Sequence, residues 1–87
     1  MGTCRIEWKK SALRELKRLD RQAVLRIVVA VESLSMQPLP SGVVKLQGSR
    51  RTYRLRVGDY RVIYELYNNR LVVQIIRVRH RRDAYRR

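Results

Sequence analysis

Between Thr52 and Leu66, apolar and polar side chains alternate on both sides of the dipeptide Gly58-Asp59. Alternation with a period of two is typical of β-strands, and a glycine in the first central position suits a tight hairpin turn. The spacing predicts opposed pairs, which are Val57 with Tyr60, Arg56 with Arg61, Leu55 with Val62, Arg54 with Ile63 and Tyr53 with Tyr64. One face of the hairpin is therefore apolar, and the other carries Arg54, Arg56 and Arg61.

An alternating segment and two helical patterns precede the hairpin. Residues 3–8 alternate and predict a short first strand, and a helix is predicted from Ala12 to Leu19 with Ser11 as its N-cap. Asp20 is predicted to cap a second helix, which ends before Pro38. The apolar positions that recur at helical spacing in this second helix are Val24, Ile27, Val28, Val31 and Leu34. The short link between the helices predicts a helical hairpin that packs its apolar side on a sheet.

Two further strands complete the predicted sheet. One covers Val43 to Leu46, and the other covers Leu71 to Val78 after the turn-prone pair Asn68-Asn69. A two-residue turn at this pair gives the opposed residues Arg70 with Tyr67, Val73 with Tyr64, Ile75 with Val62 and Ile76 with Arg61. Continued alternation puts His80 on the same face as Arg61.

The predicted fold class is α+β, in a single domain over residues 1–87. It consists of an N-terminal strand, a two-helix hairpin packed on a small, mainly antiparallel sheet, and a short C-terminal helical turn or tail. A chain of this length buries enough surface to fold without covalent cross-links. Like charges directly opposite each other destabilise a sheet. Arg56 across from Arg61 therefore predicts that an anion binds between them.

The chain is strongly basic, with 21 Lys and Arg against 7 Asp and Glu and a formal net charge of +14. Most of the basic residues are arginines, whose planar fork of donors suits phosphate. Nucleic acid or an acidic protein is therefore the expected partner. The alternative is that genome composition or thermal adaptation raises the arginine content and that the charge is only a solvated surface.

The sequence offers little for metal or covalent chemistry. Cys4 and His80 are its only cysteine and histidine, so neither a disulfide nor a metal site is expected, and no cofactor is predicted. The chain shows no signal peptide and no apolar run of about 20 residues, so the expected location is the cytoplasm, with no membrane partner. Metal-free phosphodiester chemistry remains. RNA brings its own nucleophile, the 2′-hydroxyl, and arginines stabilise the charge that develops during its attack.

Four segments together resemble the RelE family of toxins, part of the RelE/ParE superfamily of toxin–antitoxin systems. They are SALRELKRLD at 11–20, KLQG at 45–48, YRLRVGDYRVIYEL at 53–66 and VRHRRDAYR at 78–86. The resemblance covers nearly the whole chain and implies a two-helix hairpin on a small antiparallel sheet. It also implies a ribosome-dependent endoribonuclease that cuts mRNA in the A site of the 30S subunit, and a cognate antitoxin that neutralises it. Contact with operator DNA is expected only through the toxin–antitoxin complex.

The resemblance implies catalytic roles for residues at the family's motif positions. Arg54 and Arg56 are the two basic residues of the third strand, and Arg61 opens the next strand. Arg81 follows the last strand, and Tyr85 is the tail tyrosine, which is expected to stack on the base beside the cut. The two third-strand positions are lysines in the best-studied members. Arginine is a poor general base, so the departure leaves the proton acceptor open.

His80 is the candidate for proton transfer that the residues themselves suggest, because histidine titrates near neutral pH. The alternative is that it only contacts phosphate or caps the strand. Arg56 and Arg61 are expected to hold the scissile phosphate, with Arg54 in support. Arg81 or His80 would then protonate the leaving 5′-oxygen.

Further basic residues are expected to contact RNA around this centre. Those near the strands and the tail are Lys45, Arg50, Arg51 and Arg82, and those on the first helix are Lys9, Lys10, Arg14, Lys17 and Arg18. For the helix residues the alternative is a solvated face. For residues 79–87 the alternative is a disordered basic end, which is common at termini. A basic groove lined by apolar strand edges also favours an antitoxin that is acidic and helical.

Two other functions stay open at this point. ParE-type relatives share this fold but inhibit DNA gyrase, and they lack the basic cluster and the tail tyrosine that this sequence has. A non-catalytic module that binds RNA or the ribosome is the other alternative, because arginine replaces lysine at both third-strand positions. The products discriminate between the three functions. A nuclease of this type leaves cyclic-phosphate RNA ends, a gyrase inhibitor leaves broken DNA, and a binding module leaves RNA intact.

Overall fold

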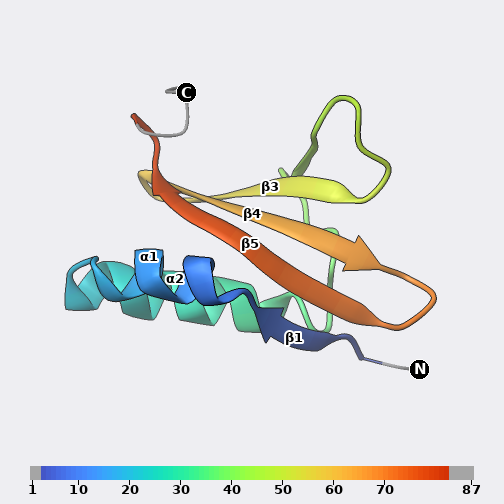
Figure 1. Ribbon diagram of the computed structural model, residues 1–87, viewed down its shortest axis with the longest axis horizontal. Helices are drawn as coiled ribbons and strands as arrows, with labels where there is room; N and C mark the ends of the chain where they lie inside the picture. Colours follow the sequence, from blue (N-terminus) through green and yellow to red (C-terminus); the bar gives the residue numbers. More distant parts are fainter. Residues whose placement is uncertain (1–2, 83–87) are drawn as a thin grey trace.

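The computed structural model describes residues 3–82, in which two helices pack on one face of a five-stranded sheet (Figure 1). The strands are β1 (Arg5–Trp8), β2 (Val44–Lys45), β3 (Thr52–Val57), β4 (Tyr60–Tyr67) and β5 (Val72–His80), and the helices are α1 (Lys10–Lys17) and α2 (Arg21–Ser33). The strand order is β1-β5-β4-β3-β2, with β1 parallel to β5 and the other neighbours antiparallel. This is the α+β architecture that the hydrophobic pattern predicts.

The two helices differ in how they begin. The N-cap of α1 is Lys9, which forms no side-chain cap bond, so the predicted Ser11 cap is wrong. The Lys9 N–H instead donates to the carbonyl of Ile75 at 3.0 Å, which turns the chain into α1 directly after β1. The Asp20 cap of α2 is confirmed, because its carboxylate accepts a hydrogen bond from the Ala23 N–H at 2.9 Å. Neither helix is long and apolar enough to cross a membrane, and the described part of the chain has no other.

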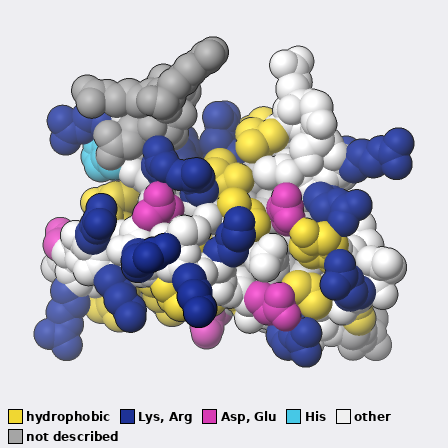
Figure 2. All heavy atoms as spheres, in the orientation of Figure 1, with side chains coloured by type: hydrophobic (Ala, Val, Ile, Leu, Met, Phe, Trp, Pro, Cys, Tyr) yellow, Lys and Arg dark blue, Asp and Glu magenta, His cyan; other side chains and the backbone are white. Residues whose placement is uncertain are grey.

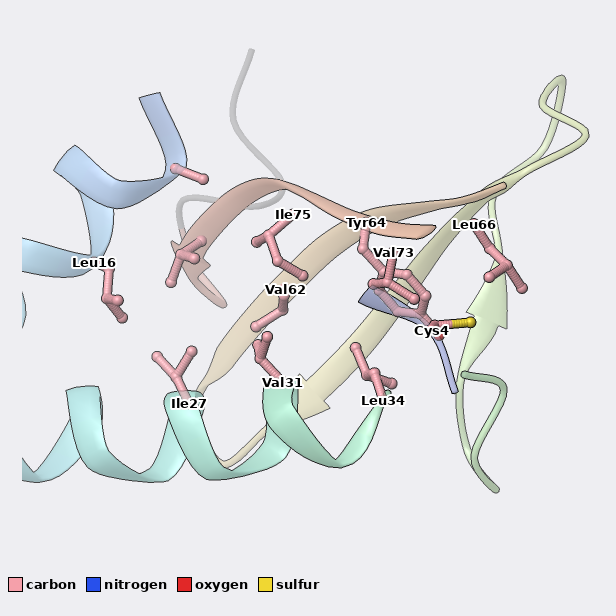
Figure 3. Close-up of a cluster of buried hydrophobic side chains, with 12 residues drawn as sticks. Cys4, Leu16, Ile27, Val31, Leu34, Val62, Tyr64, Leu66, Val73 and Ile75 are labelled. Carbon is pink, nitrogen blue, oxygen red and sulfur yellow. The ribbon is translucent and has the colours of Figure 1, made fainter. Parts of the chain in front are cut away.

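The core lies between α2 and the sheet (Figure 3). Ile27, Val31 and Leu34 point from α2 toward the strands and are fully buried. The fully buried side chains that meet them from β4 and β5 are Val62, Tyr64, Val73 and Ile75. Each such side chain stabilises the fold by about 1.5–3 kcal/mol. The helices occupy this face, and we call the opposite face of the sheet the open face.

The β3–β4 hairpin has the predicted register. Arg56 lies opposite Arg61 and Leu55 opposite Val62, and the other predicted pairs are confirmed as well. Gly58 has a φ of 58°, which an L side chain adopts only at a cost. This glycine therefore fixes the two-residue turn and, through it, the register of the whole hairpin.

The predicted two-residue turn between β4 and β5 is wrong. Tyr67 pairs with Val72 and not with Arg70, so the connection holds the four residues 68–71. Leu71, the last of them, takes a φ of 52°. β5 therefore begins one residue later than predicted and continues to His80.

A β-bulge then moves the register of β5 a second time. Tyr64 pairs with Ile75 but its neighbour Ile63 pairs with Arg77, which leaves Ile76 as the extra residue. The combined shift is odd, so it exchanges the two faces for the last part of β5. His80 consequently lies opposite Tyr60, and the prediction that it shares a face with Arg61 is wrong.

Candidate active site

Three arginines lie directly opposite one another on the open face, Arg56 on β3, Arg61 on β4 and Arg79 on β5. We call them the arginine row. Opposed residues of neighbouring strands project to the same face, with their Cβ atoms about 4.5–5.5 Å apart. Arg54 lies two residues before Arg56 and therefore projects to the same face. Three arginines thus lie side by side on neighbouring strands near the β3–β4 turn.

In the part of the chain that the structure describes, Arg56 and Arg61 have no acidic partner. Arg61 is buried, with 8% of its surface exposed, and its Nη1 donates to the Tyr60 carbonyl at 3.3 Å. Arg56 is exposed, and its Nε donates to the Gly58 carbonyl at 3.4 Å. Within residues 3–82, neither of them forms an ion pair, and neither does Arg54. A partly desolvated guanidinium beside a second one favours the binding of an anion such as phosphate.

Glu15 of α1 holds the β5 end of the arginine row. Its Oε2 lies 3.2 Å from Arg79 Nε and 3.7 Å from Arg77 Nη1, and its Oε1 accepts a hydrogen bond from the Val78 N–H at 2.9 Å. Arg79 is therefore partly neutralised, and Arg56 and Arg61 carry the free positive charge. Sequence reasoning missed both Arg77 and Arg79, although their alternation with Val78 was a visible signal. The sequence does not reveal the bulge, so the face to which Arg77 and Arg79 project could not be predicted.

His80 occupies a different environment from the predicted one. Its ring packs edge-on against Tyr60, with the ring centroids 5.3 Å apart at an angle of 83°. Its Nδ1 accepts a hydrogen bond from the Arg82 N–H at 3.3 Å. The neutral ring in this arrangement carries its proton on Nε2, so it presents a donor and no free acceptor.

Arg81 reaches the site through its backbone. Its N–H donates to the Asp59 carbonyl at 2.6 Å, which fixes Arg81 against the β3–β4 turn, next to Arg56 and Arg61. The structure thus brings together all four predicted catalytic arginines, which are Arg54, Arg56, Arg61 and Arg81. Tyr85 lies outside the described residues.

The predicted RNA-binding residues spread over several parts of the molecule. Arg50 and Arg51 lie in the loop just before β3, away from the β3–β4 turn, and Lys45 lies on the edge strand β2. The exposed basic residues on and beside α1 are Lys9, Lys10, Arg14, Lys17 and Arg18. Figure 2 shows Lys and Arg side chains scattered over both the helices and the sheet on the face in view. Among residues 3–82, no three His, Cys, Asp or Glu side chains cluster as metal ligands.

A helical hairpin on one face of a small sheet, with paired arginines on the other face, makes this chain a basic α+β protein. The chain matches the family model described as "ParE toxin of type II toxin-antitoxin system, parDE" over residues 6–85. Toxin RelG of Mycobacterium tuberculosis is 32% identical over 83 residues, which cover 94% of this chain and 95% of RelG. Toxin RelE3 of Methanocaldococcus jannaschii is 28% identical over 85 residues, covering 93% of this chain and 94% of RelE3.

A solved structure shows the same fold. The archaeal RelE–RelB complex from Pyrococcus horikoshii contains a chain that is 31% identical, with a TM-score of 0.82 over 91% of this chain and 96% of that one. The protein therefore belongs to the RelE/ParE family. It is a toxin of a type II toxin–antitoxin system with a RelE-like fold.

Proposed function

We propose that this toxin is a metal-independent endoribonuclease that cuts mRNA in the A site of the ribosome. The observation that carries the proposal is the opposed pair Arg56 and Arg61, which has no carboxylate partner among residues 3–82. The similarity to toxins RelG and RelE3 supports the nuclease branch of the family. The family model carries a ParE description, so gyrase inhibition is the second candidate.

In the proposed reaction, the 2′-hydroxyl of the mRNA attacks the adjacent phosphorus and the bond to the 5′-oxygen breaks. The products are a 2′,3′-cyclic phosphate and a 5′-hydroxyl. Arg56 and Arg61 hold the phosphate and stabilise the charge that develops on its oxygens, and Arg54 supports them. Tyr85 stacks on the base beside the cut.

Two proton transfers complete the reaction. Arg81, fixed against the β3–β4 turn next to Arg56 and Arg61, protonates the leaving 5′-oxygen, because His80 lies on the other face of the sheet. The 2′-hydroxyl proton therefore leaves to water or to a ribosomal group, because guanidinium groups do not accept protons in this pH range.

An antitoxin is the second part of the proposal. The similar RelE chain from P. horikoshii is in complex with RelB. The net charge of +14 favours an acidic partner. On α2, Leu25 and Val29 are 59% and 69% exposed and lie one turn apart, which suits an amphipathic helix of that partner. Operator DNA would be contacted only through the complex, and the cytoplasm is the place where such a toxin meets ribosomes.

Primer extension on mRNA programmed into 70S ribosomes tests the proposed function. We expect cuts in the A-site codon that require ribosomes, and we expect a 2′-deoxy sugar on the 5′ side of the cut to abolish them. The upstream fragment should end in a cyclic phosphate. Intact mRNA at toxin concentrations that stop growth would overturn the nuclease proposal, and DNA breaks with purified gyrase would then establish the ParE-type activity.

A further inference from the structure

The open face carries a second basic cluster at its other end. Tyr67 is the last residue of β4 and lies six residues after Arg61, so both side chains project to the open face. At about 3.3 Å per residue, the two positions are about 20 Å apart along the strand. The second cluster thus belongs to the same surface as the arginine row but is separate from it.

The ring of Tyr67 organises this cluster, which we call the Tyr67 cluster and which consists of Arg51, Glu65, Tyr67 and Arg70. The guanidinium carbons of Arg51 and Arg70 lie 4.9 and 4.8 Å from the centre of the ring. The Tyr67 hydroxyl donates to Glu65 Oε1, and this hydrogen bond raises the pKa of Tyr67. The tyrosine is therefore neutral near pH 7, and its ring orients two otherwise flexible arginines.

An arginine packed on a ring keeps its in-plane N–H groups available. Both Arg51 and Arg70 are exposed, and neither forms an ion pair within residues 3–82. Stacked guanidinium groups that still present free donors are suited to phosphate oxygens. The ring thus lowers the entropy cost of binding by holding both forks in place beforehand.

Two hollows border the Tyr67 ring. One of about 440 Å³ lies over β1, β5 and the end of β4, and its lining includes Arg5, Arg70 and Gln74. The other, of about 360 Å³, is lined by Arg50, Arg51 and the loop after β4. The linings of both include arginine and side-chain amide donors.

The charge of this region is positive, although it contains two carboxylates. Arg5 is paired with Glu7 at 3.0 Å, and Glu65 accepts the hydrogen bond from Tyr67. Arg50, Arg51 and Arg70 stay free of ion pairs in the described part of the chain. A phosphate backbone with attached bases matches this mixture of free cations and hydrogen-bonding groups better than a bare anion does.

We propose that the Tyr67 cluster is a second RNA-binding site, which grips the backbone of a single strand a few nucleotides away from the phosphate held by Arg56 and Arg61. The proposal rests on the proposed function in one respect, because it assumes that RNA lies along the open face. The cluster itself needs no catalysis to bind. An RNA strand that spans both ends of the face would be held at two points and aligned across the arginine row.

The test uses the full-length toxin and a fluorescent, nine-nucleotide 2′-O-methyl RNA, which has no free 2′-hydroxyl and stays intact. Anisotropy titrations over a range of salt concentrations compare wild type with Arg70→Gln, Tyr67→Leu and Arg21→Gln. Arg21→Gln is the matched control, because Arg21 is exposed on α2 and loses the same charge. A three-nucleotide probe, too short to span the face, is measured in parallel.

We expect Arg70→Gln to weaken binding of the nine-nucleotide probe and to lower the salt slope by about one. Tyr67→Leu, which changes no charge, should also weaken binding of this probe, because the guanidinium groups of Arg51 and Arg70 lose the ring on which they pack. The Arg21→Gln control should show neither effect, and the three-nucleotide probe, which reaches only one end of the face, should bind wild type more weakly than the nine-nucleotide probe does. Equal losses for Arg70→Gln and Arg21→Gln, with wild-type binding by Tyr67→Leu, would overturn the proposal and leave only unspecific charge or a protein-binding surface.

Failure of the proposed nuclease function is recognised separately. If wild-type toxin leaves ribosomal mRNA intact but Tyr67→Leu still weakens RNA binding, the second site stands and the nuclease proposal falls. If wild-type toxin cuts mRNA and Tyr67→Leu binds the probe normally, the second site falls and the nuclease proposal stands.

Discussion

At the scale of single residues, Tyr64 shows how this small core accommodates a polar group. Its side chain is fully buried and stacks on Tyr53 with ring centroids 5.8 Å apart. Its hydroxyl donates to the Pro38 carbonyl at 2.6 Å, which ties the segment after α2 to the sheet. Burial, together with the nearby Tyr53, raises the pKa of Tyr64 to about 12. The Tyr64 hydroxyl therefore stabilises the fold, although it lies on the apolar face.

This environment predicts a specific pH dependence of stability. The pKa of Tyr64 is higher in the folded protein than the value of 10.0 expected for the unfolded chain, so the unfolded chain loses its proton first. The contribution to stability is fully present below pH 10 and is lost as the pH rises through about 12. Urea unfolding at several pH values should show Tyr64→Phe with a smaller decrease than wild type in this window.

At pH 7 the same variant should be about 1 kcal/mol less stable than wild type, because the Pro38 carbonyl loses its donor. Parallel curves for the two proteins between pH 10 and 12 would contradict the assigned environment of Tyr64.

At the scale of elements, the edge of β5 depends on α1. β1 pairs with β5 only from Val72 to Ile75, and beyond that point Glu15 accepts the hydrogen bond from the Val78 N–H. The same carboxylate binds Arg79 and Arg77. The Glu15 side chain thus accepts a hydrogen bond that a neighbouring strand would otherwise accept, and it positions Arg79 at one end of the arginine row.

Replacing this carboxylate should destabilise the fold. Glu15→Ala leaves the Val78 N–H without its acceptor, and we expect a loss of about 1–3 kcal/mol in the free energy of unfolding. Glu32→Ala, at an exposed position of α2 without a side-chain partner in the described residues, is the matched control. Denaturant unfolding measures both, and equal stabilities of the two variants would show that Glu15 does not close the β5 edge.

The two hairpins show which parts of the sheet were predictable. The β3–β4 register followed from the sequence because Gly58 selects a two-residue turn, and a tight turn fixes every pair after it. The β4–β5 register did not follow, because Asn68-Asn69 does not reveal a loop that ends in a positive φ at Leu71. The bulge at Ile76 has no local signature and depends on how β5 meets α1 and β4.

The candidate site was predictable to the same extent. Arg54, Arg56 and Arg61 were found because they lie on the predictable hairpin. Arg79 was missed and His80 was misplaced, because both follow the bulge. Local alternation therefore identified the arginines whose register is fixed by the β3–β4 turn. The positions of Arg79 and His80 depend on tertiary packing around the bulge.

At the scale of the whole molecule, the helices and the open face have different tasks. α2 and the sheet bury the apolar side chains, so the opposite face can collect arginines without disturbing the core. The arginine row and the Tyr67 cluster occupy opposite ends of that face. We therefore propose that one sheet face both binds RNA and cuts it, with Arg61 at the reacting phosphate.

Single-turnover cleavage of A-site mRNA, with saturating toxin, tests this claim most directly for wild type, Arg61→Ala and the control Arg21→Ala. Circular dichroism and unfolding curves establish that each variant is folded. The cleavage rate of Arg56→Ala, at an exposed position, tests the other member of the opposed pair. We predict that Arg61→Ala lowers the rate constant by about 100-fold or more, while Arg21→Ala keeps the wild-type value. Cleavage by folded Arg61→Ala at the wild-type rate would contradict the account.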